Sequence, residues 1–438
     1  MNSFAAYEIG QELHNGPMTR VLRGRRKADG QPVVLKMLNQ LHPLAEQIAR
    51  FKLEYATLSS LHLPGVVRTD GLEIDQGYWL IVMEDFGGES LARLGANTAM
   101  PVGEFLPLAI ALIESVGQIH QQRVIHKDIN PANIVLNPQS GEVKLIDFGL
   151  ATRLSQENQT AHYPSRLEGT LAYMSPEQTG RMNRGLDYRT DYYSLGVTFY
   201  ELLSGQLPFP GGDALTLVHA HLARQPTPLS VHQPDIPAPL AAIVMQLLAK
   251  NAEDRYQSAF SLQRDLEACL HQWQTTGQIQ PFPLRQLDVS SQFQVAQRLY
   301  GRESEIEQLL AAFARVSQGT SEVMMVAGAA GIGKSALVQE VYKPATARRG
   351  YFIAGKFDQL QRDIPYASLI QAFRQLVRQL LTESEAEVAA WRAKLHNALE
   401  TNGQVLIDVM PEVELILGVQ PAVPVLPPAE AQNRFHHV

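Results

Sequence analysis

The stretch that decides the fold is HKDINPANIVLNPQSGEVKLIDFG, which occupies residues 126–149. It places Asp128, Asn133 and Asp147 at the spacing that phosphoryl transfer from a nucleoside triphosphate requires. A carboxylate at Asp128 can accept the proton of an acceptor hydroxyl. The Asp147 carboxylate and the side-chain carbonyl of Asn133 are oxygen ligands of the kind that Mg²⁺ prefers. The stretch therefore predicts a base followed by two magnesium ligands.

A short hairpin is expected between the two ligands. The apolar runs IVLN (residues 134–137) and VKLI (residues 143–146) flank PQSGE, which supplies a proline and a glycine for the turn. This hairpin brings Asn133 and Asp147 to the same end of a sheet. An isolated Asp-Phe-Gly would be an ordinary turn, but in register with HxDxxxxN it indicates a catalytic site.

Length and composition restrict the class of protein. A chain of 438 residues is too long for one hydrophobic core and predicts two or three domains. The net charge of -7 argues against a nucleic-acid partner, and the single Cys269 excludes an internal disulfide framework. No signal peptide is recognised, and no run of about 18 apolar residues predicts a membrane span. We therefore expect a cytoplasmic location.

The first 85 residues are expected to form a small β-rich lobe. The β-prone segments YEIGQEL, TRVLRGRR and PVVLKML are separated by Asn-Gly and Asp-Gly turns, which predicts an antiparallel meander. Residues 43–61 repeat apolar side chains at three- and four-residue steps, which predicts a helix. Two further strands, VVRTDGLEI and GYWLIVMED, lead into a hinge at residues 86–88. From there to about residue 270 the pattern is mostly helical.

Five residues outside the opening stretch complete the candidate site. Lys36 ends the run VVLK, where its ammonium would hold the α and β phosphates, and Glu54 on the following helix would orient it. Downstream, Glu177 in SPE is expected to form a buried ion pair with Arg255. Asp191 opens an apolar helix and is expected to bind the backbone of the catalytic loop from beneath.

Residues 7–270 resemble the protein kinase superfamily, because VVLK, HKDINPAN, DFG and SPE occur in this order. GTLAYMSPE is similar to serine/threonine kinases rather than tyrosine kinases. The resemblance implies an α+β bilobal protein kinase fold, with a β-rich small lobe and a helical large lobe. It also implies ATP and Mg²⁺ as cofactors and a protein substrate that carries Ser or Thr.

The resemblance assigns roles to individual residues. The catalytic group would be Asp128, Lys36, Glu54 and Asn130. The nucleotide-binding group would be Gly16, Val21, Lys36, Glu84, Asn133 and Asp147. The metal ligands of this site would be Asn133 and Asp147.

Three positions depart from the pattern of the superfamily. The nucleotide-covering loop is usually GxGxxGxV, whereas residues 14–21 read HNGPMTRV and keep only Gly16. Asn130 stands where similar kinases carry a Lys that contacts the γ-phosphate, and such a loss commonly costs on the order of 100- to 1000-fold in rate. Lys127 replaces the usual Arg and lacks its bidentate fork.

A second nucleotide site is predicted in the domain at residues 299–438, after a linker at residues 271–298. LYGRESEIEQLLAAFARV starts an amphipathic helix, and SEVMMVAGAAGIGKSALVQEVY (residues 321–342) predicts a buried strand, a glycine-rich loop and a helix. The loop fits GxxxxGK[ST], in which backbone amides and a lysine hold phosphates and a hydroxyl binds Mg²⁺. The phosphate-binding residues would be Gly328, Gly331, Gly333, Lys334 and Ser335, with Ser335 as the metal ligand.

This second domain resembles the P-loop ATPases of the AAA and STAND classes, with residues 300–302 similar to their adenine-side element. A Walker B strand would complete the magnesium site, and VLIDVMPE (residues 405–412) is the nearest candidate. Asp408 lacks a second acid after it, so we interpret this run as a structural helix or strand. About 140 residues are few for a complete module, and we expect a partial α/β P-loop NTPase domain.

The order kinase, linker and P-loop ATPase resembles the N-terminal part of large bacterial hybrid serine/threonine and histidine kinases, especially cyanobacterial ones. INPANIVLN, GKFDQLQRDIPYASLIQAF and LPPAEAQNRF are similar to that group. The resemblance implies two-component signalling proteins as partners and a regulatory role for the ATPase module.

Three functions remain open from the sequence. The first is an active serine/threonine protein kinase. The second is a nucleotide-binding pseudokinase scaffold, motivated by the reduced glycine loop and Asn130. The third is a small-molecule phosphotransferase, which would share HxDxxxxN but would lack SPE, Asp191 and Arg255.

Overall fold

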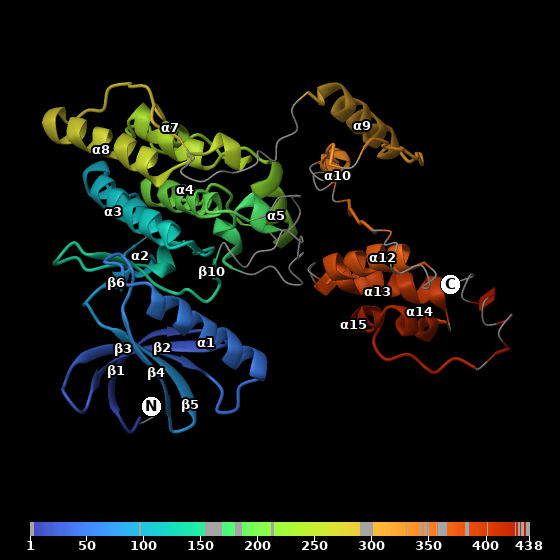
Figure 1. Ribbon diagram of the computed structural model, residues 1–438, viewed down its shortest axis with the longest axis horizontal. Helices are drawn as coiled ribbons and strands as arrows, with labels where there is room; N and C mark the ends of the chain where they lie inside the picture. The colour runs from blue at the N-terminus through green and yellow to red at the C-terminus, as the bar shows by residue number, and fades with distance from the viewer. Residues whose placement is uncertain are drawn as a thin grey trace.

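The computed structural model describes residues 4–434 except 96–97, 154–168, 180–185, 212–213, 290–300, 330, 342–343, 346–347, 349, 356, 358–365, 382–384, 401, 425, 428–429 and 431–432. Within this part of the chain, a β-rich small lobe is followed by a helical large lobe (Figure 1). The two lobes have the secondary structure that the sequence predicted.

A five-stranded antiparallel sheet forms the small lobe, with strand order β1-β2-β3-β5-β4. The strands are β1 (Tyr7–Asn15), β2 (Thr19–Arg26), β3 (Pro32–Leu38), β4 (Thr69–Asp75) and β5 (Tyr78–Glu84). The predicted antiparallel meander is confirmed, because β1 pairs with β2 and β2 pairs with β3. Strands β2 and β3 have the bounds of the predicted segments. One face of the sheet buries a small apolar cluster: Phe4, Tyr7, Leu22, Val33, Leu35, Met37, Leu80 and Val82.

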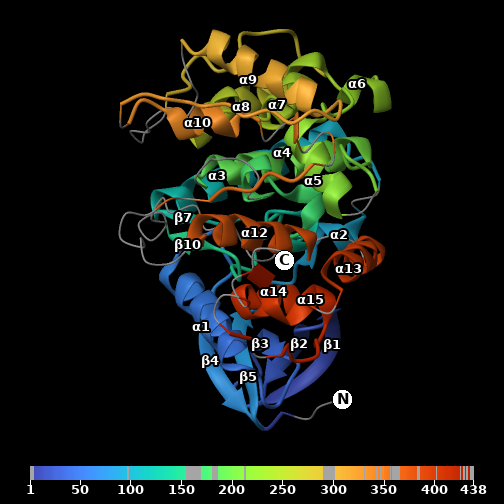
Figure 2. The same ribbon diagram turned by 90° about the vertical axis from the view of Figure 1, so that its right-hand side faces the viewer.

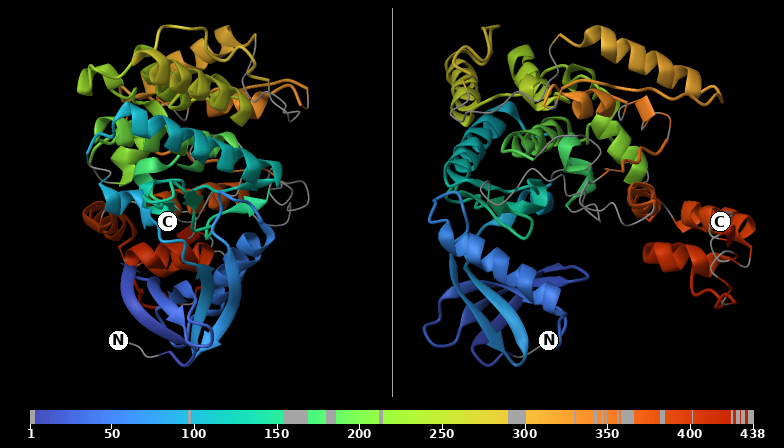
Figure 3. Two further views of the ribbon diagram at one scale, coloured as in Figure 1. Left: turned by 90° about the vertical axis from the view of Figure 1, so that its left-hand side faces the viewer. Right: turned by 45° about the vertical axis from the view of Figure 1, so that its right-hand side comes forward.

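Helix α1 (Ala45–Ser60) packs beside β4 (Figure 3). The Gln47 side chain accepts the Leu44 N–H at 2.7 Å, which satisfies one of the free amides at the start of the helix. Phe51 and Leu58 face the protein core, and Glu54 lies buried between them on the same side. The predicted helix is confirmed, and the acidic side chain on its buried face needs a charged partner.

The large lobe is built around α4 (Arg189–Ser204), all of whose residues are buried. It packs on α3 (Val102–Gln121) and α7 (Ala238–Leu247), and α8 (Ala259–Thr276) packs on both of these helices. By length and composition α3 could cross a membrane, but here it is a core helix against α8. The smaller helices are α2 (Leu91–Leu94), α5 (Ala214–Ala223) and α6 (Leu229–His232), with short 3-10 turns at Pro131–Asn133, Leu171–Tyr173, Pro176–Thr179 and Ala252–Asp254.

Two small sheets lie between the lobes and carry the catalytic stretch. One has the order β6-β8-β9, and the other pairs β10 with β7. Their strands are β6 (Glu89–Ser90), β7 (Val124–Ile125), β8 (Ile134–Leu136), β9 (Val143–Leu145) and β10 (Thr152–Arg153). The antiparallel β8–β9 pair is the predicted hairpin, so this prediction is confirmed.

The chain after α8 folds back onto the large lobe. Ile279 is buried, and the Asp288 carboxylate accepts the N–H groups of Gln257 and Ser258 at 2.8 and 3.1 Å, just before α8 begins. The Arg285 Nε atom donates to Asp288 at 2.8 Å. The first part of the predicted linker is therefore bound to the kinase-like region, and residues 290–298 lie outside the described part of the chain.

The region after residue 300 is helical where it is described. Its helices are α9 (Glu303–Val316), α10 (Lys334–Gln339), α12 (Ala367–Leu380), α13 (Glu385–Leu399), α14 (Gly403–Val409) and α15 (Glu414–Leu417), with a 3-10 turn at Pro411–Val413 (Figure 2). The last four helices share a small core that contains Val377, Leu399, Ile407 and Ile416. The predicted amphipathic helix near residues 299–316 is confirmed as α9.

The prediction of a buried strand before the glycine-rich loop is wrong. Residues 321–329 have no regular structure, and Val323 and Met325 are 96% and 90% exposed. The apolar pattern is present, but a strand also needs hydrogen-bonding neighbours. Among the described residues after 300 no strand is formed, so none pairs with this segment.

Candidate active site

The catalytic loop after β7 is held by one buried carboxylate, as expected for Asp191. Its oxygens accept the backbone N–H groups of His126 and Lys127 at 2.9 and 2.8 Å and contact His120 Nε2 at 2.8 Å. Burial alone would raise the pKa of Asp191, but the contacts with His120 and His126 lower it below its usual value. The loop backbone is fixed where Lys127 has a positive φ of 71°.

The Asp128 carboxylate is oriented by donors from two different segments. One oxygen accepts the backbone N–H of Thr170 at 2.9 Å, and the other accepts Asn133 Nδ2 at 3.0 Å. Both donors leave lone pairs on the carboxylate for a further hydroxyl. Thr170 was not among the predicted site residues, because its role depends on a contact across 42 positions of the chain.

Lys36 links the small lobe to the metal-binding turn. From β3 its Nζ lies 2.7 Å from Glu54 Oε1 and 2.9 Å from Asp147 Oδ1. Burial alone would lower the pKa of Lys36, but the two carboxylates raise it above its usual value, so the amine stays charged. Burial and the nearby Asp147 charge raise the pKa of Glu54 to about 7, although Lys36 opposes this shift. The predicted partners are brought together.

Asn133 and Asp147 flank the β8–β9 hairpin, as the sequence predicted. The Ile146 N–H donates to the Asn133 carbonyl at 3.0 Å, which ties the two ends together. Asn133 Nδ2 donates to the Asp128 backbone and side chain, so Oδ1 is the Asn133 atom that suits a cation. Asp147 has a positive φ of 62° and accepts the Gly149 N–H at 3.2 Å. An amide oxygen and a carboxylate fit Mg²⁺, which takes its remaining ligands from phosphates and water.

The Asn130 side chain is buried and engaged with protein atoms. Its Oδ1 accepts the Ala132 N–H at 3.0 Å, and its Nδ2 donates to the Asp128 carbonyl at 3.0 Å and to Thr170 Oγ1 at 3.3 Å. Asn130 thus joins the catalytic loop to the Thr170 segment. It carries no positive charge that could replace the lysine usual at this position.

The predicted nucleotide contacts of the small lobe lie in the β1–β2 turn (Gly16), on β2 and β3 (Val21 and Lys36) and at the end of β5 (Glu84). The Gly16 N–H donates to the Thr19 carbonyl at 2.9 Å, which closes the β1–β2 turn, and Val21 pairs with Lys36 across β2 and β3. A side chain at Gly16 would meet His14 Nε2, so His14 lies against this glycine. The Glu84 carboxylate is bound to Lys144 Nζ at 2.6 Å, which leaves its backbone as the part able to face a nucleotide.

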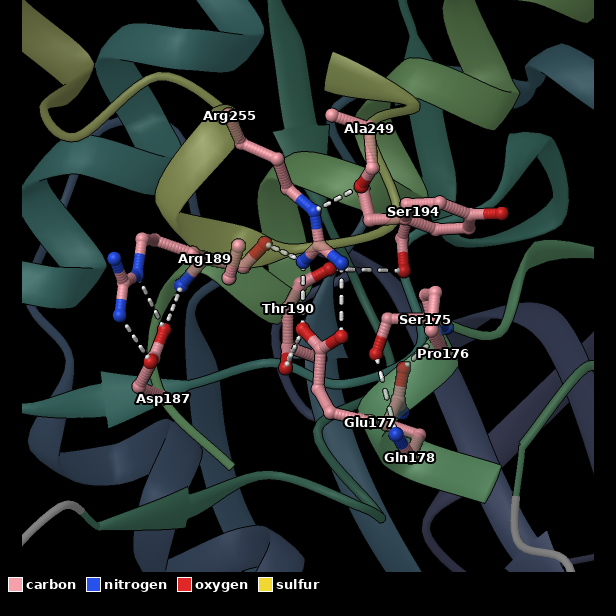
Figure 4. A network of polar contacts seen from close by, with 12 residues as sticks. Ser175, Pro176, Glu177, Gln178, Asp187, Arg189, Thr190, Ser194, Ala249 and Arg255 are labelled. Atoms are coloured by element: carbon pink, nitrogen blue, oxygen red, sulfur yellow. Dashed lines mark hydrogen bonds and ion pairs between the residues drawn. The ribbon is translucent and has the colours of Figure 1, made fainter. Parts of the chain in front are cut away.

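A buried ion pair fixes the segment that follows the catalytic groups (Figure 4). Arg255 Nη1 and Nη2 donate to the two oxygens of Glu177 at 2.6 and 2.8 Å, and both side chains are buried. Thr190 Oγ1 adds a third donor to Glu177 at 2.9 Å. Arg255 also donates to backbone carbonyls of Ala249, Lys250 and Arg189. The predicted pair is confirmed, and its surroundings satisfy the guanidinium completely.

The glycine-rich loop before α10 has the conformation that its glycines allow. Gly331 and Gly333 have positive φ angles of 79° and 94°, which side chains rarely adopt. Lys334 Nζ donates to the carbonyls of Gly328 and Ala329 at 2.9 and 2.7 Å, so the ammonium lies over the loop. Asp408 lies on helix α14 and accepts Gln404 Nε2 at 2.8 Å, which agrees with the structural interpretation of that run. Tyr300 lies outside the described residues.

Two family profiles match this chain. The profile of the protein kinase domain matches residues 7–273, which is more than half of the chain. The chain belongs to the protein kinase family. Its fold is a protein kinase domain with an N-terminal sheet and a helical large lobe. The profile of an AAA ATPase domain matches residues 298–438, so an AAA-type ATPase domain follows the protein kinase domain.

Several curated proteins are similar to this protein kinase. Hybrid signal transduction histidine kinase G of Dictyostelium discoideum is 37% identical over 286 residues, which are 61% of this chain and 8% of that protein. A probable serine/threonine-protein kinase of Streptomyces coelicolor is 32% identical over 60% of this chain and 40% of its own length. A serine/threonine-protein kinase of Myxococcus xanthus is 35% identical over 60% of this chain and 32% of its own length. The chain thus covers less than half of each of these relatives.

In the structure the hinge runs from Glu84, at the end of β5, to Glu89, at the start of β6, and is thus longer than the predicted residues 86–88. Sequence reasoning missed two cations that contact it. Arg23 on β2 forms ion pairs with Asp85 and Glu89 at 2.9 Å each, and Lys144 on β9 binds Glu84. The available signal was the acidic hinge itself, because three carboxylates within six residues require compensating charge.

Proposed function

We propose that this protein is an ATP-dependent serine/threonine protein kinase. The observation that carries the proposal is the Asp128 carboxylate, which is held between Thr170 and Asn133. Asn133 begins the hairpin that leads to Asp147, and Asp147 pairs with the charged Lys36 ammonium. An acceptor hydroxyl placed against Asp128 would pass its proton to this carboxylate as its oxygen bonds to the γ-phosphorus, while the bond from that phosphorus to the β–γ bridging oxygen breaks and ADP leaves. Lys36, oriented by Glu54, would neutralise the non-transferred phosphates.

Magnesium is part of the proposal and would be held by Asn133 Oδ1 and Asp147. When bound, it would neutralise phosphate charge during the transfer. In the structure Asp147 pairs with Lys36, so one residue would contact both the ammonium and the cation. Ser335 would be the corresponding ligand in the ATPase domain.

A protein substrate is favoured over a small molecule. The buried Glu177–Arg255 pair, with Thr190, fixes the segment immediately after Thr170, which gives a peptide a rigid surface beside Asp128. The relatives from Streptomyces and Myxococcus are named serine/threonine-protein kinases, which supports Ser or Thr as the acceptor. The hybrid histidine kinase relative supports two-component signalling proteins as partners, and we propose a cytoplasmic location for this signalling role.

The competing function is a nucleotide-binding pseudokinase, which the uncharged Asn130 favours. Transfer of label from ATP to protein by the wild type, Asp128→Ala and Asp147→Ala separates the two. We expect Mg²⁺-dependent labelling of Ser or Thr that both substitutions abolish. Equal background labelling by all three proteins would reject the kinase.

We propose that the ATPase domain adds a second nucleotide site at Gly328, Gly331, Gly333, Lys334 and Ser335. The positive φ angles of two of these glycines and the position of Lys334 over the loop support it. Calorimetric titration with ATP should give two sites for the wild type and one for Lys334→Ala. Equal stoichiometry in the two proteins would reject the second site.

A further inference from the structure

The hinge of the kinase domain, residues 84–89, carries three acidic side chains within six positions: Glu84, Asp85 and Glu89. It connects β5 of the small lobe with β6. Like charges at this spacing repel one another, more strongly where water is partly excluded. A fixed hinge therefore needs cations. Arg23 of the small lobe and Lys144 of the large lobe bind it from its two sides, and Arg93 on α2 adds an ion pair with Glu89 at 3.3 Å.

Arg23 binds the hinge from the small lobe. From β2 its Nη2 donates to the Gly88 carbonyl at 2.6 Å, and its Nη1 donates to Glu89 Oε1 at 2.9 Å. Its Nε lies 2.9 Å from Asp85 Oδ2 as an ion pair without an aligned hydrogen bond. Because the guanidinium is planar and rigid, these contacts fix Asp85, Gly88 and Glu89 relative to the sheet.

Lys144 binds the hinge from the large lobe. From β9 its Nζ lies 2.6 Å from Glu84 Oε1 and 5.0 Å from the centroid of the Phe86 ring, and only 9% of its side chain is exposed. The same Glu84 oxygen accepts the Arg68 N–H at 2.9 Å. Asn137, in the turn of the same hairpin, donates to the Phe86 carbonyl at 2.6 Å. These contacts fix Glu84 and Phe86 relative to the β8–β9 hairpin, which leads to Asp147.

We propose that Arg23 and Lys144 are positioning residues that set the ATP affinity of the kinase cleft by fixing the hinge backbone. This inference rests on the proposed kinase function, in which Glu84 faces the nucleotide through its backbone. Neither cation contacts Asp128, Asn133 or Lys36, so the transfer step does not depend on them. Loss of either cation frees a partly buried carboxylate to turn toward water and move the hinge with it.

The test uses the full chain with Lys334→Ala as the common background, so that nucleotide binding reports the kinase cleft alone. Lys144→Met keeps the apolar stem and removes the charge, Lys144→Arg keeps the charge, and Arg23→Gln removes the fork. The matched control is Arg25→Gln, because Arg25 lies on the same strand and its Nη1 donates to the Gly30 carbonyl at 3.2 Å, away from the hinge and from residues 14–21.

We expect Lys144→Met and Arg23→Gln each to raise the Kd and the KM for ATP about tenfold, with kcat within about twofold of the background. Lys144→Arg should restore most of the affinity, and Arg25→Gln should leave it unchanged. If Lys144→Met does not fold, as judged by circular dichroism, Arg23→Gln and Lys144→Arg decide the question.

Unchanged ATP affinity in folded Arg23→Gln and Lys144→Met would overturn the proposal while leaving the kinase function intact. A fall in kcat at constant KM would also overturn it. If the background protein itself bound no ATP, the proposed function would fail and the positioning role with it. If it bound ATP without transferring phosphate, the Kd values would still decide the roles of Arg23 and Lys144.

Discussion

At the scale of single residues, Asn130 shows how the catalytic loop is adapted. A lysine at this position would add a charge, whereas Asn130 uses both ends of its amide to join the Asp128 and Thr170 segments. Asn130 therefore contributes by holding Asp128 in position. A small displacement of a general base lowers the rate of the chemical step by a large factor.

Asn130→Ala should lower kcat about 10- to 100-fold, because the Asp128 carboxylate loses its fixed relation to Thr170. The Kd for ATP should stay within about twofold, since both ends of the Asn130 amide are already hydrogen-bonded within the loop and to Thr170. Steady-state kinetics and calorimetry measure the two quantities. Asn251→Ala, at a partly exposed turn, is the control, and a kcat equal to that of the control would contradict the assignment.

Arg255→Met should lower the free energy of unfolding by about 3–5 kcal/mol, because it leaves Glu177 buried and unpaired. The comparison is Arg20→Gln, whose exposed pair with Glu12 should cost at most about 1 kcal/mol. Urea unfolding measures both. Similar losses in the two proteins would show that burial of the Glu177–Arg255 pair does not matter.

The stability of the large lobe should depend on pH through His221. Burial, and next the Lys250 charge, lower the pKa of His221 to about 4, while its Nδ1 lies 2.9 Å from the Tyr193 hydroxyl. Between pH 4 and about 6.5 the unfolded chain binds a proton that the folded chain does not. The free energy of unfolding therefore falls as the pH falls through this range, by about 2 kcal/mol between pH 7 and pH 5.

His221→Gln removes this titration and should flatten that part of the pH dependence. Urea unfolding of both proteins at pH 7 and pH 5 gives the difference. Parallel losses in wild type and variant would exclude His221 as the cause.

At the scale of elements, local patterns predicted the segments whose partners are close in sequence. Strands β2 and β3 and helix α1 follow from turns and apolar spacing, and the β8–β9 hairpin follows from residues 134–146. The same reasoning failed for residues 321–327, because an apolar run indicates burial only where neighbouring strands exist to cover it. The contacts of Arg23 and Lys144 with the hinge span 66 and 60 positions, so the acidic hinge indicated a need for cations but not which residues supply them.

The start of α8 supplies a prediction at this scale. The Asp288 carboxylate accepts the N–H groups of Gln257 and Ser258, so the segment after α8 stabilises the beginning of that helix. Asp288→Ala should lower the free energy of unfolding by about 1–3 kcal/mol. Hydrogen exchange at the Gln257 and Ser258 amides should accelerate. Unchanged protection of these amides would contradict the capping role.

At the scale of the whole molecule, one apolar core runs from α1 through the catalytic hairpin to α8. It explains how groups from separate segments come together: Lys36 from β3 contacts Glu54 from α1 and Asp147 from the turn after β9. Asp128, from the loop after β7, is bound to Asn133 at the start of the same hairpin. The order of these residues along the chain predicted their meeting only through the kinase signature as a whole, because Lys36 and Glu54 have no specific local motif of their own. The helical region after residue 300 has its own small core around Ile407 and Ile416.

The central claim is that Asp128 is the general base of an active kinase, and that the protein is not a nucleotide-binding pseudokinase. The most direct measurement is the rate of phosphoryl transfer to Ser or Thr by Asp128→Asn, together with its Kd for ATP, both in the Lys334→Ala background. We predict unchanged ATP affinity and a rate at least about 100-fold below that of the background protein. Equal transfer rates for the two proteins, at equal ATP affinity, would contradict the claim.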